Sequence, residues 1–266
     1  MKLGPIHILR DGTYNDLVGR FRNVKRELDE LTKSDYRFTY QRLVDDLKKS
    51  HSEEEAMSRA VGGSFEVVGA LELALLKRFG LAPQHHVVDV GCGSGRLAKP
   101  LSTFSKGGYL GTDIVPDLVA YAERLVQRPD WKFQVAKGLT IPEEPGRADF
   151  VCFFSVLTHL RHEESFVYLQ DAKRVAKPGG KIVFSFLEFA VPGHWEILEY
   201  NLRCLASDRI EPLNQFMSRD MVDAVSQHLD LEIEAIHRGD EPLVAIDSSG
   251  TLHAFGQSVA VLRKRS

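Results

Sequence analysis

The sequence predicts an α/β fold built on a parallel β-sheet, and two observations lead to this class. From residue 86 onward, short β-branched or aromatic runs alternate with amphipathic helical stretches, which is typical of parallel βαβ units. The first apolar run, Val87–Val90, breaks into glycines and then restarts as a helix. Strands of such sheets commonly end this way where a ligand binds. The composition, 43% hydrophobic and 27% charged over 266 residues, is ordinary for a globular protein.

The first 62 residues are polar and helical in pattern, and we expect them to form an extension outside the sheet domain, 63–266. Apolar residues recur at helical spacing over 17–31 and again over 43–47. An aromatic stretch with Tyr36, Phe38 and Tyr40 separates these two segments. Because these helices lie outside the fold core, we expect them to close over the functional site as a lid. Gly62-Gly63 marks the boundary, and a helix over 65–79 leads into the first strand.

The remaining elements follow from the same periodicity. Strands are predicted near 86–90, 108–112, 131–136, 148–154 and 181–187. Helices are predicted between them at 95–104, 116–128 and 163–176. The alternation then stops at an insert, 187–217, with one predicted helix at 194–206. A helix at 219–228, capped by Ser218, and strands near 230–237 and 255–263 are predicted to follow.

The run 87–95, Val-Val-Asp-Val-Gly-Cys-Gly-Ser-Gly, carries most of the functional information in the chain. Glycines allow backbone to come close to a ligand because they have no Cβ, and a helix start offers free N–H groups. A dinucleotide fingerprint would need glycine at position 96, where this chain has Arg96. That residue disfavours an NAD-dependent oxidoreductase. A glycine-rich turn without any ligand is the other alternative.

Three further segments follow in order. Tyr109–Asp113 is predicted to be a strand ending in a carboxylate, which suits a ribose diol or the N-cap of the helix that Pro116 opens. The segment 148–160 continues a strand into Ser-Val-Leu-Thr-His-Leu, and 176–184 has Lys-Pro-Gly-Gly before another strand. Together with the acidic residue and Gly-x-Gly-x-Gly of 87–95, these motifs resemble the class I S-adenosylmethionine (SAM)-dependent methyltransferases.

The resemblance covers about 80–264. It implies a Rossmann-like sheet of seven strands in the order 3-2-1-4-5-7-6, mostly parallel with an antiparallel last strand, and helices on both faces. It also implies SAM as the cofactor, with Asp113 on its ribose. Many members carry an aspartate for the adenine amine where this chain has Lys137, so we expect backbone groups there to read adenine. The expected cofactor-binding residues are Asp89, Gly91, Cys92, Gly93, Gly95, Asp113, Ile114, Lys137, Gly138, Leu139 and Ser155.

The acceptor is expected beyond the end of the fourth strand, near Thr158 and His159. Transfer to a hydroxyl needs a base, and histidine titrates close to neutral pH. His159 is therefore the predicted catalytic base, with a substrate hydrogen bond or a structural role as alternatives. His194 and Trp195 of the insert could bind substrate or simply pack the insert.

Other histidines are predicted to lie away from the chemistry. His85 and His86 precede the first strand at the opposite end of the sheet and are expected at the surface. His162 is expected to be solvated in the following helix. No spacing of His, Cys, Asp or Glu suggests a metal site, so none is expected.

The predicted function is methyl transfer to a small-molecule hydroxyl, as in a sugar or natural-product intermediate. The alternatives are N-methylation of a small amine or heterocycle, or a non-catalytic SAM-fold binding module. A net charge of −3 argues against nucleic acid as a partner. No apolar run approaches the roughly 20 residues of a membrane span. Three cysteines without pair spacing suggest a reducing cytoplasm, and a homodimer is compatible with these features.

Overall fold

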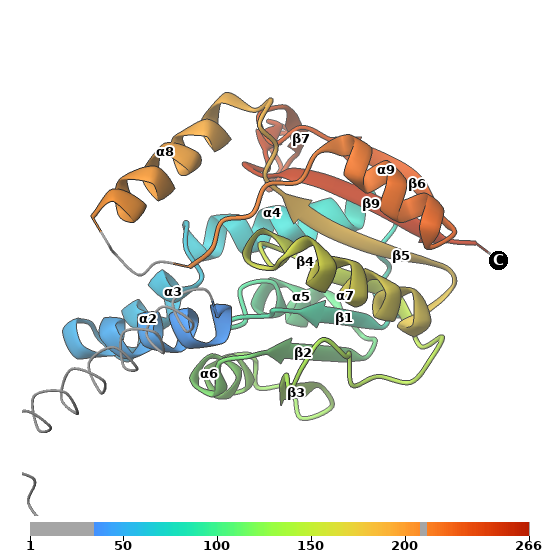
Figure 1. Ribbon diagram of the computed structural model, residues 1–266. Coiled ribbons are helices and arrows are strands. Elements are labelled where there is room, and N and C mark those ends of the chain that lie inside the picture. The colour runs from blue at the N-terminus through green and yellow to red at the C-terminus, as the bar shows by residue number, and fades with distance from the viewer. Residues whose placement is uncertain (1–34, 208–211, 266) are drawn as a thin grey trace, which may run out of the picture.

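The computed structural model describes residues 35–207 and 212–265. Its centre is a seven-stranded sheet in the order β3-β2-β1-β4-β5-β9-β6 (Figure 1). β9 runs antiparallel to both β5 and β6, and the other neighbours are parallel. The predicted strand order and the antiparallel last strand are therefore confirmed. The strands are β1 (Val87–Val90), β2 (Tyr109–Asp113), β3 (Lys132–Val135), β4 (Ala148–Phe153), β5 (Ala176–Phe186), β6 (Leu231–His237) and β9 (Ser258–Lys264).

Side-chain alternation along the strands divides the core into two layers. Val88 and Val90 of β1 belong to one apolar cluster with residues of α7 (His162–Val175) and α9 (Arg219–His228). Val87 belongs to a second cluster with residues of α4 (Phe65–Arg78) and α5 (Ala98–Phe104). α6 (Pro116–Val126) lies against β2 and β3. Asp89 is the one polar residue of β1, so its carboxylate is placed inside the protein.

The N-terminal extension contains two described helices. α2 (Tyr36–Ser50) begins at Asp35, whose side chain accepts a hydrogen bond from the Arg37 N–H at 2.9 Å. The aromatic stretch that we expected to precede a helix thus lies within α2. α3 (Glu53–Ala60) was not predicted, although Ser52 caps it and three glutamates fill its first turn. The predicted apolar repeat at 17–31 lies outside the described residues.

Both helices of the extension are packed onto the sheet domain. Val44 of α2 and Met57 of α3 form a small buried cluster with Val115 and Leu118, at the start of α6. Two surface ion pairs, Lys48–Asp117 and Arg124–Glu53, also join the extension to α6. The extension therefore reaches the carboxyl ends of β1 and β2, where the glycine-rich turn lies.

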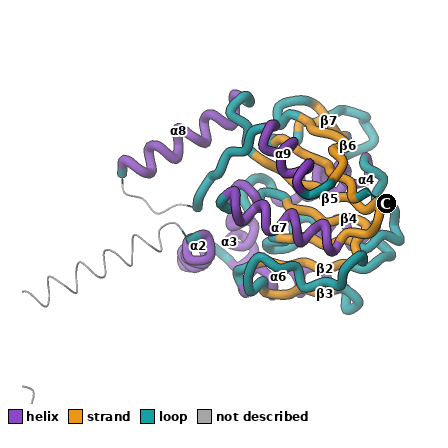
Figure 2. Tube along the Cα trace, turned by 45° about the vertical axis from the view of Figure 1, so that its right-hand side comes forward, coloured by secondary structure: helices purple, strands orange, loops and turns teal. Residues whose placement is uncertain are grey.

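The insert places a helix beside the sheet domain. α8 (Pro192–Ala206) projects from the body in both Figure 1 and Figure 2. After it, the chain returns to the sheet, and Phe216 forms an isolated β-bridge with Leu187. A small two-stranded sheet, β7 (Pro242–Val244) with β8 (His253–Ala254), was not predicted. No helix in the described part of the chain is long and apolar enough to cross a membrane.

Several boundaries differ from the prediction by two to five residues: α8 begins at Pro192 rather than residue 194, and β9 at Ser258 rather than residue 255. The helix after the glycines begins at Ala98 rather than residue 95, because tight turns occupy the intervening residues. β5 begins at Ala176 rather than residue 181, because Ala176 already pairs with Ala148 of β4 before a bulge.

Candidate active site

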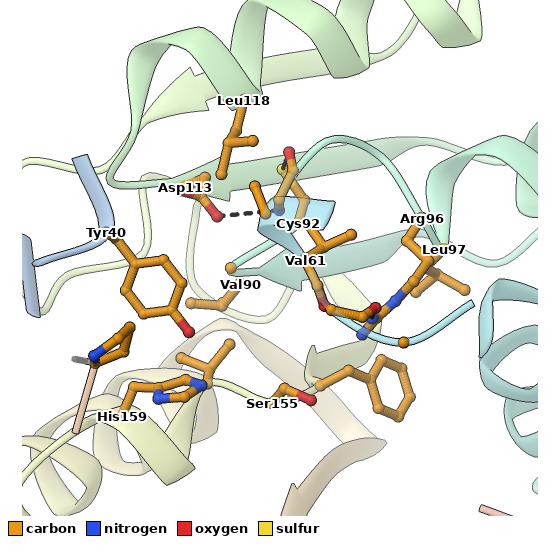
Figure 3. Close-up of a pocket in the computed structure, with 18 of the residues that line it drawn as sticks. Tyr40, Val61, Val90, Cys92, Arg96, Leu97, Asp113, Leu118, Ser155 and His159 are labelled. Atoms are coloured by element: carbon orange, nitrogen blue, oxygen red, sulfur yellow. Dashed lines mark hydrogen bonds between the residues drawn. The ribbon is translucent and has the colours of Figure 1, made fainter. Parts of the chain in front are cut away.

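A cavity of about 540 Å³ opens at the carboxyl ends of β1, β2 and β4 (Figure 3). Ligands of open α/β sheets bind at this edge, beside the switch in strand order. α2, α3 and the turn after α3 form part of its wall. Tyr200 of α8 and the returning segment at Pro212 and Asn214 contribute another part. The cavity therefore combines the sheet edge with both accessory segments of the chain.

The glycine-rich turn is held by hydrogen bonds within the protein. The N–H groups of Gly91 and Cys92 both donate to the Thr112 carbonyl, at 2.7 and 2.9 Å. The Gly93 N–H donates to Asp113 Oδ2 at 3.0 Å. The Gly95 N–H donates to the Cys92 carbonyl at 3.0 Å. The expectation that this turn offers free N–H groups is therefore wrong at these four positions, because three of them bind β2 and the fourth closes the turn on itself.

The glycines also make room for protein rather than only for a ligand. Gly91 and Gly93 have φ values of 73° and 53°, a conformation that side chains disfavour. A Cβ on Gly93 would lie 2.5 Å from Cγ1 of Val61, and a Cβ on Gly91 would collide with Val156. Because the glycines lack a Cβ, the turn after α3 and the segment after β4 can lie directly against the glycine turn. These two segments then form two sides of the cavity.

Asp89 is a buried carboxylate at the floor of the cavity. It is 3% exposed, and Tyr109 donates its hydroxyl to Oδ2 at 2.8 Å. Burial raises the pKa of Asp89 to about 7, although the bond from Tyr109 works in the opposite direction. A cation bound nearby would favour the ionised form, so this residue suits a positively charged ligand.

Asp113 ends β2 and connects the two sides of the glycine turn. Its Oδ2 accepts from the Gly93 N–H and its Oδ1 from the Val115 N–H at 2.9 Å. Burial raises the pKa of Asp113 to about 6, and these backbone hydrogen bonds limit the rise. A carboxylate has about four acceptor positions, so two stay available for a diol. Asp113 can therefore bind a ribose diol and also hold the start of α6, since Val115, whose N–H donates to it, is the N-cap of that helix.

Arg96, which stands where a dinucleotide fingerprint has glycine, forms a buried ion pair with Glu72. Its Nη2 lies 2.7 Å from Oε1 of Glu72, and the two side chains are 10% and 2% exposed. Arg96 Nη1 also donates to the carbonyls of Val61 and Gly62, at 2.8 and 3.2 Å. Burial raises the pKa of Glu72, and Arg96 opposes this rise. This buried pair fixes the glycine turn to α4 and to the turn after α3.

The predicted adenine segment lies beside the cavity. Ala136 lines it, whereas Lys137, Gly138 and Leu139 are not among its lining residues. The Gly138 carbonyl accepts from the Tyr168 hydroxyl at 2.8 Å, and Leu139 packs against the core. Of the other expected cofactor residues, Gly95 also lies outside the lining and packs against Ala122. The rest lie in the wall: Asp89, Gly91, Cys92, Gly93, Asp113, Ile114 and Ser155.

His159 lies in the cavity wall, in the short helix η1 (Leu157–His159) that follows β4. Its Nδ1 is 2.5 Å from the Leu213 carbonyl oxygen. A carbonyl only accepts hydrogen bonds, so Nδ1 carries the proton and Nε2 of the neutral ring keeps its lone pair. Burial lowers the pKa of His159, although the bond to Leu213 works in the opposite direction. The imidazole is thus held neutral, with Nε2 as a proton acceptor.

Tyr40 of α2 packs against this histidine. The two ring centroids are 5.1 Å apart in an edge-to-face arrangement (Figure 3). Tyr36, Tyr40 and Leu43 all line the cavity and lie on one face of α2. The aromatic stretch was visible in the sequence, and helical spacing places Tyr36 and Tyr40 on one side of α2 and the exposed Phe38 on the other. No comparable sequence pattern pointed to Tyr168 or Tyr200, which also line the cavity.

A polar cluster at the ends of β4, β5 and β9 forms the adjoining wall. The Ser155 N–H donates to Oγ of buried Ser185 at 2.8 Å, and Ser155 has a φ of 58°. Both serine hydroxyls donate to Oε1 of Gln257, at 2.6 Å from Ser185 and 3.3 Å from Ser155. Since Oε1 is used twice, the amide nitrogen is the group that Gln257 can offer to a ligand. Gln257 lines the cavity, and sequence reasoning missed it.

The other predicted acceptor residues lie outside the cavity lining. The hydroxyl of Thr158 is buried, and it has no hydrogen-bond partner within the described chain. His194 is 2% exposed and holds the insert in place, with Nδ1 2.8 Å from the Glu188 N–H and Nε2 2.9 Å from the Gly256 carbonyl. Trp195 is exposed and contacts Phe189. Of the predicted substrate residues, the structure thus brings only His159 into the cavity.

Two expectations about the remaining histidines are wrong. His86 is half-buried, and its Nε2 lies 2.6 Å from Oε2 of Glu143. His162 is also half-buried, and its Nδ1 is buried without a partner in the described residues. The described residues contain no group of three or more His, Cys, Asp or Glu side chains that could hold a metal ion.

The cavity fits SAM by its volume and by the chemistry of its acceptors. Ligand cavities typically measure about 300–1,000 Å³. Two buried carboxylates with raised pKa values, Asp89 and Asp113, match the positive charges and the ribose diol of SAM. The N–H groups of the glycine turn are already bonded within the protein, so they cannot bind a phosphate group. SAM has no phosphate and does not need such donors. Asp113 would hold the ribose, and Asp89 would supply negative charge on the same side.

Comparisons with solved structures agree with this fold. A chain in the complex between the Haloferax volcanii Trm112 methyltransferase activator and a methyltransferase matches with a TM-score of 0.63 at 17% identity, over 85% of this chain and 98% of that one. Magnesium protoporphyrin IX methyltransferase of Synechocystis, with bound SAH, matches with a TM-score of 0.53 at 18% identity, over 75% and 82%. The family model described as a methyltransferase domain matches residues 88–184.

The chain therefore has the fold of the class I SAM-dependent methyltransferases, and its central segment, residues 88–184, is similar to the methyltransferase domain family. SAM is the cofactor of this class. Among curated proteins, it is similar to an uncharacterised protein of Methanocaldococcus jannaschii, at 29% identity over 46% of this chain and 54% of the relative. It is also similar to the ubiquinone biosynthesis O-methyltransferase of Hydrogenovibrio crunogenus, at 26% identity over 47% and 52%. The matches thus span about half the length of these relatives.

Proposed function

We propose that the protein transfers a methyl group from SAM to a hydroxyl of a small molecule. The observation that supports this most is the hydrogen bond from His159 Nδ1 to the Leu213 carbonyl, because it leaves Nε2 as an acceptor in the cavity wall. Two curated relatives with partial matches are named O-methyltransferases, one of them from Pyrenophora dematioidea. A neutral hydroxyl needs a base of this kind, and the comparison is consistent with that chemistry.

Each wall of the cavity has a separate task in this proposal. SAM supplies a methyl group on a cationic sulfur, which is already activated for transfer. Asp113 and Asp89 bind the cofactor, and Tyr36 and Tyr40 pack the acceptor and limit the entry of water. His159 Nε2 takes the hydroxyl proton as the acceptor oxygen becomes a better nucleophile. Gln257 orients the acceptor through its amide nitrogen, because its Oε1 is fixed by two serines.

The cavity favours a compact acceptor with an aromatic or apolar body. Tyrosines from three helices and Phe154 and Phe255 line it. Such rings pack planar or apolar groups well, and the cavity volume suits one small molecule beside a nucleoside. A test uses SAM with a radiolabelled methyl group and a panel of phenols, catechols, sugars and amines. Label in hydroxyl compounds supports the proposal, whereas label only in amines contradicts it.

Replacing Asp113 by alanine should weaken SAM binding by about 1–3 kcal/mol, or roughly 5- to 150-fold, because a charged hydrogen bond is lost. Isothermal titration calorimetry measures this directly. Asp117→Asn is the control, because it removes an exposed carboxylate close by on α6. Wild-type affinity should also fall as pH drops through about 6, where Asp113 becomes protonated. Binding of NAD in place of SAM would contradict the cofactor assignment.

We further propose that the N-terminal extension acts as a lid on the acceptor side. Tyr40→Ala should raise the KM for the acceptor about tenfold, because it removes an aromatic wall from the cavity. Tyr40→Phe keeps the ring and should change the KM less than about threefold. Steady-state kinetics at saturating SAM separates the two variants. Equal KM values for wild type and Tyr40→Ala would show that the extension does not cover the acceptor.

A further inference from the structure

α8 has an apolar stripe that no other part of the described chain covers. Trp195, Leu202 and Leu205 are 48%, 56% and 79% exposed, and Leu198 lies between them on the same face, half-buried. Only His194 and Cys204 of this helix are buried. Figures 1 and 2 both show α8 standing away from the sheet domain. A row of large apolar side chains in water is unfavourable, and such patches commonly mark interaction sites.

The stripe has the same spacing in both directions along the helix. Its residues follow one another at intervals of three, four and three positions, with the midpoint at residue 200. In an antiparallel copy centred there, Trp195 would face Leu205, and Leu198 would face Leu202. An interface across a two-fold axis must match itself in this way, because the same patch occurs on both sides.

The charged residues beside the stripe would also pair with opposite charges of a second, antiparallel copy. Glu199 and Arg203 lie on one flank, and neither forms an ion pair of 4.0 Å or less within the described residues. In an antiparallel pair of helices, equal flanks face each other, so Glu199 of one copy would lie within two positions, about 3 Å along the axis, of Arg203 of the other. This contact would occur twice. A membrane surface fits less well, since interfacial helices carry many lysines or arginines and α8 has two glutamates and one arginine.

We propose that the protein forms a two-fold symmetric dimer through antiparallel packing of α8 against α8 of a second copy. Tyr200 points to the other side of the helix and lines the cavity, so the dimer leaves the cavity wall in place. Helix pairing alone is at the small end of specific interfaces, roughly 1,200 Å² in total. The dimer should therefore be weak, with a Kd of about 1–100 μM.

Sedimentation velocity across that concentration range measures the dimer constant. Leu202→Glu should weaken dimerisation at least 30-fold, since each copy buries a charge at the centre of the contact. Leu252→Glu is the matched control, because Leu252 is a 51% exposed leucine elsewhere and should leave the constant unchanged. Far-ultraviolet circular dichroism shows whether each variant keeps its helices.

Charge reversal tests the antiparallel arrangement itself. Glu199→Arg and Arg203→Glu should each weaken the dimer about tenfold, because like charges then face each other twice. The double variant restores opposite charges and should return to within about threefold of wild type. A monomer throughout the range, or a double variant that is weaker than both single ones, would overturn the proposal. A monomer that binds phosphatidylserine vesicles through the stripe would assign it to a membrane and overturn it as well.

Discussion

His159→Ala should lower the turnover number by about 10²- to 10⁴-fold, the usual range for loss of a general base. The Leu213 carbonyl fixes the proton on Nδ1, so the wild-type ring presents a ready acceptor, and alanine removes it. SAM affinity and melting temperature should change little, because within the described residues His159 forms no hydrogen bond or ion pair with Asp89 or Asp113. His228→Ala, on the exposed face of α9, is the control and should keep full turnover.

The pH dependence distinguishes a base from a structural residue. Burial lowers the pKa of His159 from 6.5, so the base form persists below that value and turnover should fall only at lower pH. Saturating SAM keeps the titration of Asp113, near pH 6, out of the measured turnover number. A His159→Ala variant with the same acid limb as wild type, or with near-normal turnover, would exclude the histidine as the base.

The sheet was predictable because each strand of this fold has a local signature. β1, β2 and β4 are short, almost fully buried runs of mainly apolar residues that lead into polar or glycine residues, and their order follows from the resemblance of the motifs. The glycine turn and Asp113 were found for the same reason, since they directly follow a buried strand. Local pattern therefore identifies the cofactor side of the cavity.

The acceptor side was less predictable because its parts come from distant segments. Gln257 gains its role only when β9 inserts between β5 and β6, which places its amide beside Ser185. His194 was expected near the acceptor because it follows β5, yet the chain turns and uses both ring nitrogens to hold the insert. Sequence spacing does not show which side of a loop faces a cavity.

The glycine turn has a second support that the sequence hides. In the sequence, Arg96 is informative only because it replaces the last glycine of a dinucleotide motif. In the structure, it forms a buried ion pair with Glu72. Burying two charges is unfavourable, and their contact offsets that penalty only while both partners are present. The raised pKa of Glu72, caused by burial, reflects the same penalty.

Glu72→Ala should therefore lower the free energy of unfolding by about 3–5 kcal/mol, because it leaves the Arg96 guanidinium buried without its counter-charge. Urea unfolding measures this loss. Glu66 offers a matched control on the same helix, since it pairs with Lys99 at the same 2.7 Å but is 71% exposed. Glu66→Ala should lower the free energy of unfolding by less than about 1 kcal/mol.

The double variant Glu72→Leu/Arg96→Met separates the pair's contribution to stability from its contribution to the turn. Apolar side chains of similar size remove both charges, so the free energy of unfolding should return to within about 1–2 kcal/mol of wild type. The carbonyls of Val61 and Gly62 then lose their donor, and the turn after α3 is no longer held against the glycines. SAM affinity should therefore stay reduced, even though stability recovers. Equal losses from Glu72→Ala and Glu66→Ala, or full SAM affinity in the double variant, would show that this pair does not hold the cofactor turn.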